Sequence, residues 1–210
     1  MSGTTVLLIR HAEPAEEMRG RCYGSLDVAL SGRGRSQASA LAAAVRGVPL
    51  SAVYSSPRIR ALHTALPIAQ AAGLEPIEDS RLRELDFGEL EGRTFDEIAA
   101  TEPELYRRWM EEPTEVRFPG GESYADLAAR AVGFLDATVA RHAGEHIAVV
   151  SHGGVLRALL AYCLEIPAPR IFRIAQEHTA VSVVTWIEGV PLVRLVNAPA
   201  AMLDEVVGRR

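Results

Sequence analysis

Three short runs of apolar residues along the chain have the character of buried strands. They are Thr4 to Ile9, residues 50–56 ("LSAVYSS") and residues 146–151 ("HIAVVS"). Short β-branched and apolar runs of this kind are typical of strands that are covered on both faces of a sheet. A fourth region, residues 180–197, is interrupted at Glu188-Gly189 and predicts two strands joined by a turn.

Two helices are predicted between the first strands. Ser31 is placed to cap a helix whose small apolar residues, which continue to Val45, would face a sheet. Ser56-Pro57 offers an N-cap and a first-turn proline for a second helix that runs to Ala72. Each helix is thus expected to begin at a residue type that satisfies or spares the free N–H groups of its first turn.

The second half of the chain predicts longer helices and one polar segment. A clear 3.6-residue period begins near Glu122 and continues to Thr138, and another apolar helix directly follows the strand over residues 146–151. Residues 94–121 differ from both, because their helical part is short, polar and broken by prolines. This segment is the best candidate for an insertion that covers a functional site.

The alternation of strands with helices predicts an α/β fold, a three-layer α/β/α sandwich with a mainly parallel sheet, in one domain over residues 1–210. A hydrophobic fraction of 48% is ordinary for a globular protein and excludes a disordered chain. The net charge of −5 argues against general nucleic-acid binding, and no apolar run reaches membrane length. Cys22 and Cys163 show neither a disulfide framework nor metal-ligand spacing. We therefore expect a cytoplasmic enzyme with no nucleic-acid or membrane partner.

The sequence contains no lysine, so arginine carries all of its fixed positive side-chain charge. Any site for an anion must then be built from arginine, histidine and backbone N–H groups. Arginine suits this task because its planar guanidinium group can form bidentate hydrogen bonds with two oxygens of a phosphate.

Charged groups follow the ends of three predicted strands. The first strand ends in Arg10-His11, the second leads to Arg58 and Arg60, and the third ends in Ser151-His152-Gly153-Gly154. In open α/β sheets, ligands bind beyond the carboxyl ends of the strands and near helix N-termini. Each feature alone is common in proteins without such a site, but their recurrence at three equivalent places predicts one anion-binding site.

These residues lie in blocks that resemble the histidine phosphatase superfamily, the phosphoglycerate mutase-like group. "LLIRHAE" is similar to the Arg-His-Gly-Glu signature of that family and includes Glu13, and "YSSPRIRALHTA" places the family's second arginine on Arg60. "LRELDFGELEG" places the acid glutamate on Glu84, and "FPGGES" and "VVSHGGVLRALL" match later blocks, with the second histidine on His152. Five blocks in the family's order cover nearly the whole chain. The resemblance implies a phosphoglycerate mutase-like sandwich with one antiparallel edge strand.

The resemblance also implies a mechanism. His11 would be the nucleophile and form a covalent phosphohistidine, while Arg10, Arg60 and His152 would bind the phosphoryl oxygens. Glu84 would protonate the leaving alcohol and then deprotonate the attacking water. The two arginines should lower the pKa of His11 and so keep its imidazole neutral. No metal and no cofactor is needed in this scheme.

The loop after His11 departs from the family pattern. Ala12 stands where most members have glycine, Pro14 replaces a common hydroxyl residue, and Glu17 stands near where many relatives carry an asparagine. The Cys-Tyr-Gly sequence that follows resembles α-ribazole phosphatases and, more loosely, broad-specificity phosphatases. The residues that we expect to contact the substrate are Glu13, Glu17, Cys22, Tyr23, Gly24 and Gly153.

Hydrolysis of a small phosphorylated metabolite, such as α-ribazole 5′-phosphate, is the activity that these features favour. A 2,3-bisphosphoglycerate-dependent phosphoglycerate mutase is the main alternative, although the compact 94–121 segment argues for hydrolysis. A metal-dependent hydrolase lacks its ligand spacing here, and a non-catalytic binding module is not supported because all five expected groups are present. A homodimer is plausible. No role is assigned to His63 or His178.

Overall fold

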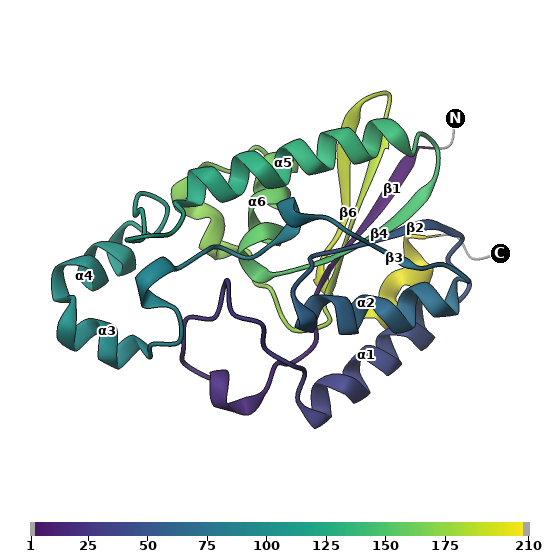
Figure 1. Cartoon of the computed structure of the whole chain (residues 1–210). Coiled ribbons are helices and arrows are strands. Elements are labelled where there is room, and N and C mark those ends of the chain that lie inside the picture. Colours follow the sequence, from purple (N-terminus) through teal and green to yellow (C-terminus); the bar gives the residue numbers. More distant parts are fainter. Residues whose placement is uncertain (1–2, 208–210) are drawn as a thin grey trace.

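The structure, a computed structural model, describes residues 3–207 and contains one six-stranded sheet with the strand order β3-β2-β4-β1-β5-β6 (Figure 1). The strands are β1 (Thr4–Arg10), β2 (Leu50–Ser55), β3 (Pro76–Glu78), β4 (His146–Ser151), β5 (Val181–Ile187) and β6 (Val190–Ala198). β1 to β4 are parallel, whereas β5 is antiparallel to both of its neighbours. The mainly parallel sheet is confirmed, and its one reversed strand is β5, one position in from the edge.

Helices cover both faces of this sheet. The α-helices are α1 (Gly32–Val45), α2 (Ile59–Ala71), α3 (Phe95–Thr101), α4 (Pro103–Glu111), α5 (Tyr124–Arg141) and α6 (Gly153–Cys163). Short 3-10 helices are η1 (Glu16–Met18), η2 (Ser80–Leu82), η3 (Gly88–Leu90), η4 (Ala168–Arg173) and η5 (Ala200–Glu205). One apolar cluster joins the sheet to α5 and α6, and a second joins it to α1, α2 and η5. The predicted three-layer α/β/α sandwich is therefore confirmed.

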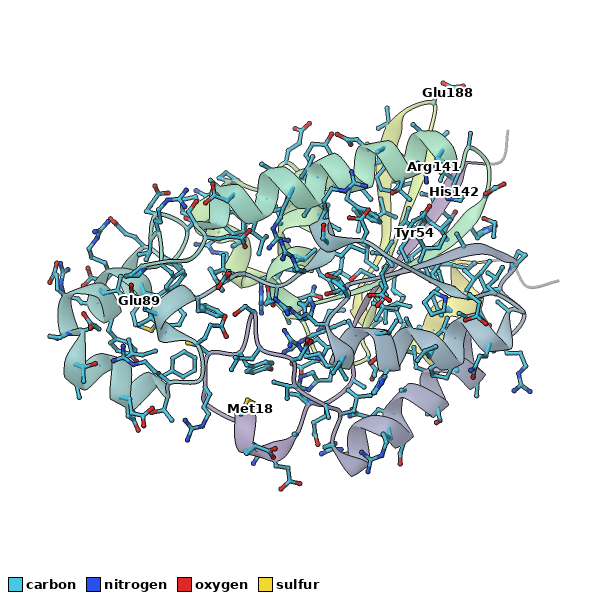
Figure 2. The ribbon with its side chains drawn as sticks, in the orientation of Figure 1. Met18, Tyr54, Glu89, Arg141, His142 and Glu188 are labelled. Carbon is cyan, nitrogen blue, oxygen red and sulfur yellow. The ribbon has the colours of Figure 1, made fainter. Side chains whose placement is uncertain are left out.

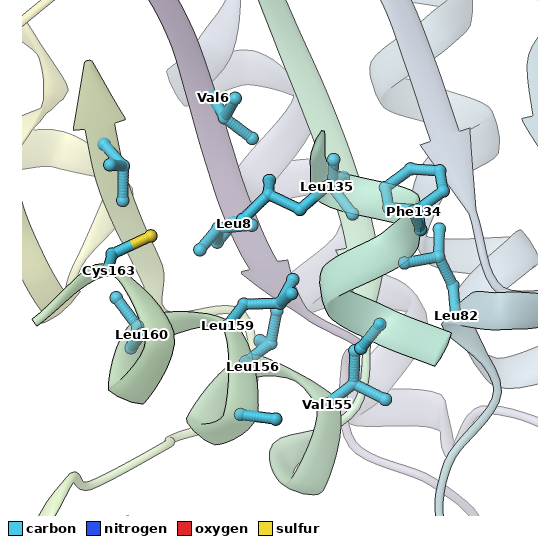
Figure 3. Packing of buried hydrophobic residues seen from close by; sticks show 14 of the residues in the cluster. Val6, Leu8, Leu82, Phe134, Leu135, Val155, Leu156, Leu159, Leu160 and Cys163 are labelled. Atoms are coloured by element: carbon cyan, nitrogen blue, oxygen red, sulfur yellow. The ribbon is translucent and has the colours of Figure 1, made fainter. Parts of the chain in front are cut away.

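The core shows why β1 carries an uninterrupted apolar run. Alternate residues of this strand point to opposite faces, so that Val6 and Leu8 pack against α5 and α6 while Leu7 and Ile9 pack against α1 and α2. Figure 3 shows Leu8 close to Leu135 of α5 in the first of these clusters. Because both faces are covered, the strand ends of β1 and its neighbour β4 are the places where polar groups can emerge.

Two helix starts illustrate how far local sequence signals hold. Ser31 caps α1 by accepting a hydrogen bond from the backbone N–H of Gly34 at 2.9 Å, as predicted. The prediction that Ser56 caps the next helix is wrong, because α2 begins at Ile59 with Arg58 as its N-cap. The Ser56 hydroxyl accepts from the N–H of Arg58, ahead of the helix, and lies 2.8 Å from a ring nitrogen of His152, the buried residue after β4. The linear pattern does not show the second contact.

The 94–121 segment lies at one end of the molecule, where α3 and α4 stand away from the sheet (Figure 1). A small apolar cluster that includes Trp109 and Phe118 holds the segment together and also takes in Cys22 from the loop after β1. Figure 2 shows Glu89 at this end and Met18 on the loop, whereas Tyr54 of β2 lies far away beside His142, with which it shares a 2.9 Å hydrogen bond. Within residues 3–207, no helix combines the length and the apolar character needed to cross a membrane.

Candidate active site

The carboxyl ends of β1 and β4 bring two histidines together. Arg10 pairs with Ser151 in the parallel register, so the next residues, His11 and His152, leave the sheet side by side. Their ring centroids are 5.1 Å apart in an edge-to-face arrangement. The predicted convergence of strand ends is thus present in the fold.

A cavity of about 280 Å³ opens beside His11. It is lined by Arg10, His11, Arg60, Glu84 and by three residues of the loop after β1, Cys22, Tyr23 and Gly24. His152 lies behind this surface rather than in it, since it is completely buried. Four of the five residues with predicted catalytic roles therefore share one cavity wall.

The protonation state of His11 follows from one hydrogen bond. Its Nδ1 lies 2.8 Å from the backbone carbonyl oxygen of Ala12, and a carbonyl oxygen can only accept, so Nδ1 carries the proton. Burial lowers the pKa of His11 well below its ordinary value, and the charges of Arg60 and Arg10 lower it further. The ring is therefore neutral at pH 7, with its lone pair on Nε2.

Arg60 is completely buried and is held by backbone oxygens. Its Nη1 donates to the carbonyl of Leu26 at 2.7 Å, and its Nη2 donates to that of Gly24 at 2.9 Å. Burial lowers the pKa of Arg60, whereas the nearby Glu84 raises it. The guanidinium group also lies 5.1 Å from the ring centre of Tyr23. No carboxylate forms an ion pair with Arg60 within the described chain, so its charge is available to an anion.

Gly24 is required where it stands by a close approach of two backbone segments. A Cβ atom added to it would lie 1.7 Å from the carbonyl oxygen of Leu85. Any side chain at this position would push apart the loop that holds Arg60 and the segment that carries Glu84. The glycine therefore fixes the distance between two walls of the cavity.

His152 connects Arg60 to the end of β2. Its Nδ1 accepts a 3.2 Å hydrogen bond from Nε of Arg60, and its Nε2 lies 2.8 Å from the hydroxyl of Ser56. Since Nδ1 accepts, the proton of the neutral ring is on Nε2, which donates to Ser56. Burial lowers the pKa of His152 well below its ordinary value, with Arg60 as the next cause. Ser56 was not expected in this position, because only the fold brings it to His152.

Glu84 is half-buried and is fixed by two backbone donors. Its Oε1 accepts from the N–H of Leu85 at 2.9 Å, and its Oε2 accepts from the N–H of Gly154 at 3.1 Å. A Cβ on Gly154 would lie 2.4 Å from Oε1 of Glu84. The second glycine after β4 therefore admits the carboxylate to the first turn of α6.

The cavity includes side chains that the sequence did not single out. They are Arg21, Phe87, Phe95 and Arg157. Arg157 falls one helical turn after Gly153 in α6, and this spacing was the available signal for it. Phe87 and Phe95 form the apolar part of the wall and belong to the end of the molecule that carries α3 and α4.

The remaining predicted contact residues divide into two groups. Gly153 lies beneath the guanidinium groups of Arg10 and Arg157, since an added Cβ would be 3.7 Å and 3.2 Å from them. Glu13 turns away from His11, accepts from the Ser31 hydroxyl at 2.9 Å and lines a neighbouring hollow. Glu17 is exposed in η1 and lines neither hollow.

The histidines and cysteines without an assigned role are also placed by the fold. His178 lies 5.4 Å from His11, measured between ring centroids, and burial together with Arg10 lowers its pKa to about 4. His63 is exposed on α2. Burial raises the pKa of the Cys22 thiol to about 12, so this cavity residue is a neutral thiol at pH 7.

No three His, Cys, Asp or Glu side chains of residues 3–207 are grouped so that they could hold a metal ion.

Comparison with known proteins agrees with this geometry. The family model of the histidine phosphatase superfamily (branch 1) matches residues 6–199. Phosphoserine phosphatase 1 of Hydrogenobacter thermophilus is 38% identical over 179 residues, which are 85% of each chain. YhfR of Bacillus stearothermophilus superimposes with a TM-score of 0.88 at 30% identity, covering 93% of this chain and 97% of the other. For the α-ribazole phosphatase of Shigella flexneri the TM-score is 0.84 at 26% identity, with 92% and 96% covered. The chain therefore belongs to the histidine phosphatase superfamily and is a phosphatase.

Proposed function

We propose that this phosphatase hydrolyses small phosphomonoesters through a covalent phosphohistidine on His11. The observation that carries the proposal is the hydrogen bond from Nδ1 of His11 to the Ala12 carbonyl, which leaves the lone pair of a buried, neutral ring on Nε2. In the first step, Nε2 attacks phosphorus and the bond from phosphorus to the ester oxygen breaks. In the second step, water attacks the phosphohistidine, and phosphate and free His11 are regenerated.

Arg10 and Arg60 stabilise the phosphoryl group while its charge spreads over three oxygens. Both line the cavity beside His11 and neither forms an ion pair with a carboxylate of residues 3–207. His152 positions Arg60 through the Nε–Nδ1 hydrogen bond and packs against the His11 ring. For His152 to bind a phosphoryl oxygen directly, its ring would have to give up its hydrogen bond to Arg60 or to Ser56.

Glu84 is the general acid and base in this scheme. In its protonated form the carboxyl group gives a proton to the ester oxygen as the leaving alcohol departs, and the resulting carboxylate takes a proton from the attacking water. Its two backbone hydrogen bonds hold the group at the cavity wall in one orientation. The proton that enters the alcohol is therefore recovered from water within the same cycle.

The substrate is a small phosphorylated metabolite. The cavity of about 280 Å³ lies just below the range of about 300–1,000 Å³ that is usual for drug-sized ligands. Phosphoserine and α-ribazole 5′-phosphate are candidates, since relatives of this chain are named for these activities. Phe95, from the 94–121 segment, supplies part of the apolar wall, which supports a role of this segment in covering the cavity.

Trapping of the phosphoenzyme tests the proposal. The wild-type enzyme is mixed with p-nitrophenyl phosphate, quenched in alkali, which preserves phosphohistidine, and digested for mass spectrometry. We expect a phosphoryl group on the peptide that contains His11, and none in the His11→Asn variant. The matched control is His63→Asn, at an exposed position of α2, which should retain the label and the turnover. A wild-type enzyme that turns over without any labelled His11 peptide would refute the mechanism.

The mutase alternative is separated by a second assay on the same enzyme. Phosphate release and phosphoglycerate isomerisation are measured side by side with 3-phosphoglycerate in the presence of 2,3-bisphosphoglycerate. Hydrolysis as the proposed activity requires that phosphate release exceed isomerisation. Isomerisation that greatly exceeds release would assign the enzyme to the mutases instead.

A further inference from the structure

Arg157 of α6 is a guanidinium group in the cavity that the mechanism above does not use. It lines the cavity with Arg10, His11, Arg60 and Glu84. Its Nε donates to the carbonyl oxygen of Ile174 at 2.9 Å, and its guanidinium group lies 5.4 Å from the ring centre of Phe172. The side chain is therefore held in place by the segment before β5, and its other N–H groups form no hydrogen bond within residues 3–207.

Arg157 lies beside Arg10, and no carboxylate of residues 3–207 is within ion-pair distance of it. Both guanidinium groups donate hydrogen bonds to backbone carbonyl oxygens of the same segment. Arg10 donates to that of Gln176, and Arg157 donates to that of Ile174. Gly153 allows them to approach one spot over the start of α6, where an added Cβ would meet Nη1 of Arg157 and Nε of Arg10. Nε of Arg10 is buried and has no hydrogen-bond partner in residues 3–207. Two fixed like charges beside an unused donor form a place where an anion is expected.

The charge in the cavity exceeds what a phosphoryl group needs. Arg10 and Arg60 together balance a phosphate dianion, and Arg157 adds a third positive charge with no carboxylate within ion-pair distance in the described chain. Burial lowers the pKa of Arg157 and Arg10 lowers it further, whereas the more distant charges of Glu84 and Glu177 raise it. Arg21, the other arginine of the cavity, is already engaged by Glu97 and by the Gly92 carbonyl.

The position of Arg157 relative to Glu84 decides which part of the substrate it meets. Glu84 is bound to the N–H of Gly154, and Arg157 lies against the neighbouring Gly153. The two side chains therefore stand next to each other over the first turn of α6, whereas Arg60 is held on the loop side by Gly24 and Leu26. A group attached to the ester oxygen that Glu84 protonates would therefore lie beside Arg157.

We propose that Arg157 is a specificity-determining residue that binds a carboxylate on the leaving half of the substrate, so that the preferred substrates are phosphorylated hydroxy acids. With Glu84 protonated, as the first step requires, the carboxylate of the substrate supplies the third negative charge that balances Arg10, Arg60 and Arg157. The inference rests on the proposed hydrolysis at His11 and deepens it by naming the substrate class.

Two pairs of substrates that differ at the carboxylate test this assignment. O-phospho-L-serine is compared with O-phosphoethanolamine, and 3-phosphoglycerate is compared with glycerol 3-phosphate, with p-nitrophenyl phosphate as a reference without a carboxylate. We expect the wild-type kcat/KM to favour the carboxylate member of each pair. In Arg157→Gln this preference should fall about 10- to 100-fold, mainly through KM, because a charge-assisted hydrogen bond is lost.

Two variants keep the result interpretable. Arg173→Gln removes an exposed arginine from the end of η4 and should leave every ratio unchanged. Arg157→Lys keeps the charge but not the planar fork, and should lose less of the preference than Arg157→Gln. Ratios between substrates are compared within one variant, so a partly unfolded preparation does not alter them.

The outcomes separate this inference from the proposed function. An equal loss of kcat/KM on all substrates in Arg157→Gln would mean that Arg157 binds the phosphoryl group, and would overturn the inference. A wild-type enzyme that hydrolyses p-nitrophenyl phosphate but shows no carboxylate preference would also overturn it while leaving the proposed function intact. A wild-type enzyme that hydrolyses none of the five compounds would overturn both.

Discussion

Nε of Arg60 donates a hydrogen bond to Nδ1 of His152 across 3.2 Å, and both side chains are completely buried. This contact joins the cation from the start of α2 to the histidine at the end of β4. It also fixes the tautomer of His152, whose other nitrogen must donate to Ser56. The orientation of Arg60 in the cavity therefore depends on a serine that does not reach the cavity itself.

Replacement of Ser56 tests this dependence. In Ser56→Ala the N–H of His152 loses its acceptor in a buried position, which should lower the free energy of unfolding by about 1–3 kcal/mol. We also expect a lower kcat on every phosphomonoester, because His152 no longer holds Arg60 in one orientation. Chemical denaturation and steady-state kinetics measure the two effects. Ser51→Ala, in the same strand, is the control: it removes only an exposed hydrogen bond to the His146 carbonyl, so both effects should be much smaller.

Replacement of Glu84 should have an effect that depends on the leaving group. In Glu84→Gln we expect kcat to fall about 10²- to 10⁴-fold for phosphate esters of alkyl alcohols, which need a proton to leave. The loss should be much smaller for formation of the phosphoenzyme from p-nitrophenyl phosphate, because p-nitrophenolate leaves without a proton. Rapid-quench kinetics with both substrates make the comparison. An equal loss of phosphorylation rate with both substrates would assign Glu84 a role other than proton transfer.

Replacement of Gly24 should disturb the cavity through backbone contact. In Gly24→Ala the new methyl group would lie 1.7 Å from the Leu85 carbonyl, so the loop that holds Arg60 must move. We expect loss of most activity and a lower thermal midpoint. Gly133→Ala is the matched control, since Gly133 is exposed on α5 and an added Cβ meets no atom within 4 Å apart from its own helix backbone and chain neighbours. That control should raise the free energy of unfolding by about 0.5–1 kcal/mol because alanine favours a helix.

Stability should decrease in mild acid because of buried neutral histidines. The pKa values of His11 and His152 are lower in the folded protein than in the unfolded chain, where they are about 6.5. Below that value the unfolded chain takes up protons that the folded protein does not. The free energy of unfolding therefore decreases as the pH is lowered. The slope is up to about 1.4 kcal/mol per pH unit for each histidine. Urea unfolding at pH 7, 6 and 5 measures it, and an unchanged free energy would show that these rings are not held neutral.

Much of the fold was predictable because its signals are local. The apolar runs of β1, β2 and β4 and the Ser31 cap depend on residues that are neighbours in the chain. β3 was missed because three residues, beginning with a proline, are too short to show a period. The start of α2 was misplaced because the partner of Ser56, His152, is 96 residues away.

In the candidate site, too, the residues marked by a local sequence pattern were predictable, and those placed by distant contacts were not. Arg10, His11 and Glu84 lie in recognisable blocks, and the fold brings them to one cavity. Arg157 lies in such a block too, but its place in the cavity depends on the Ile174 carbonyl that holds it. Glu17 was expected near the substrate from its position in the chain alone, and the 3-10 turn of η1 leaves it exposed instead.

The hydrogen bond between Nδ1 of His11 and the Ala12 carbonyl has a consequence for the second half of the reaction. Because Nδ1 retains its proton when Nε2 is phosphorylated, the proposed intermediate is an N-phosphoryl imidazolium that carries a positive charge on its ring. When water attacks, the ring departs as neutral imidazole, which is a far better leaving group than an imidazolate anion. One backbone oxygen therefore makes the histidine both a nucleophile toward the ester and an easily displaced carrier of the phosphoryl group.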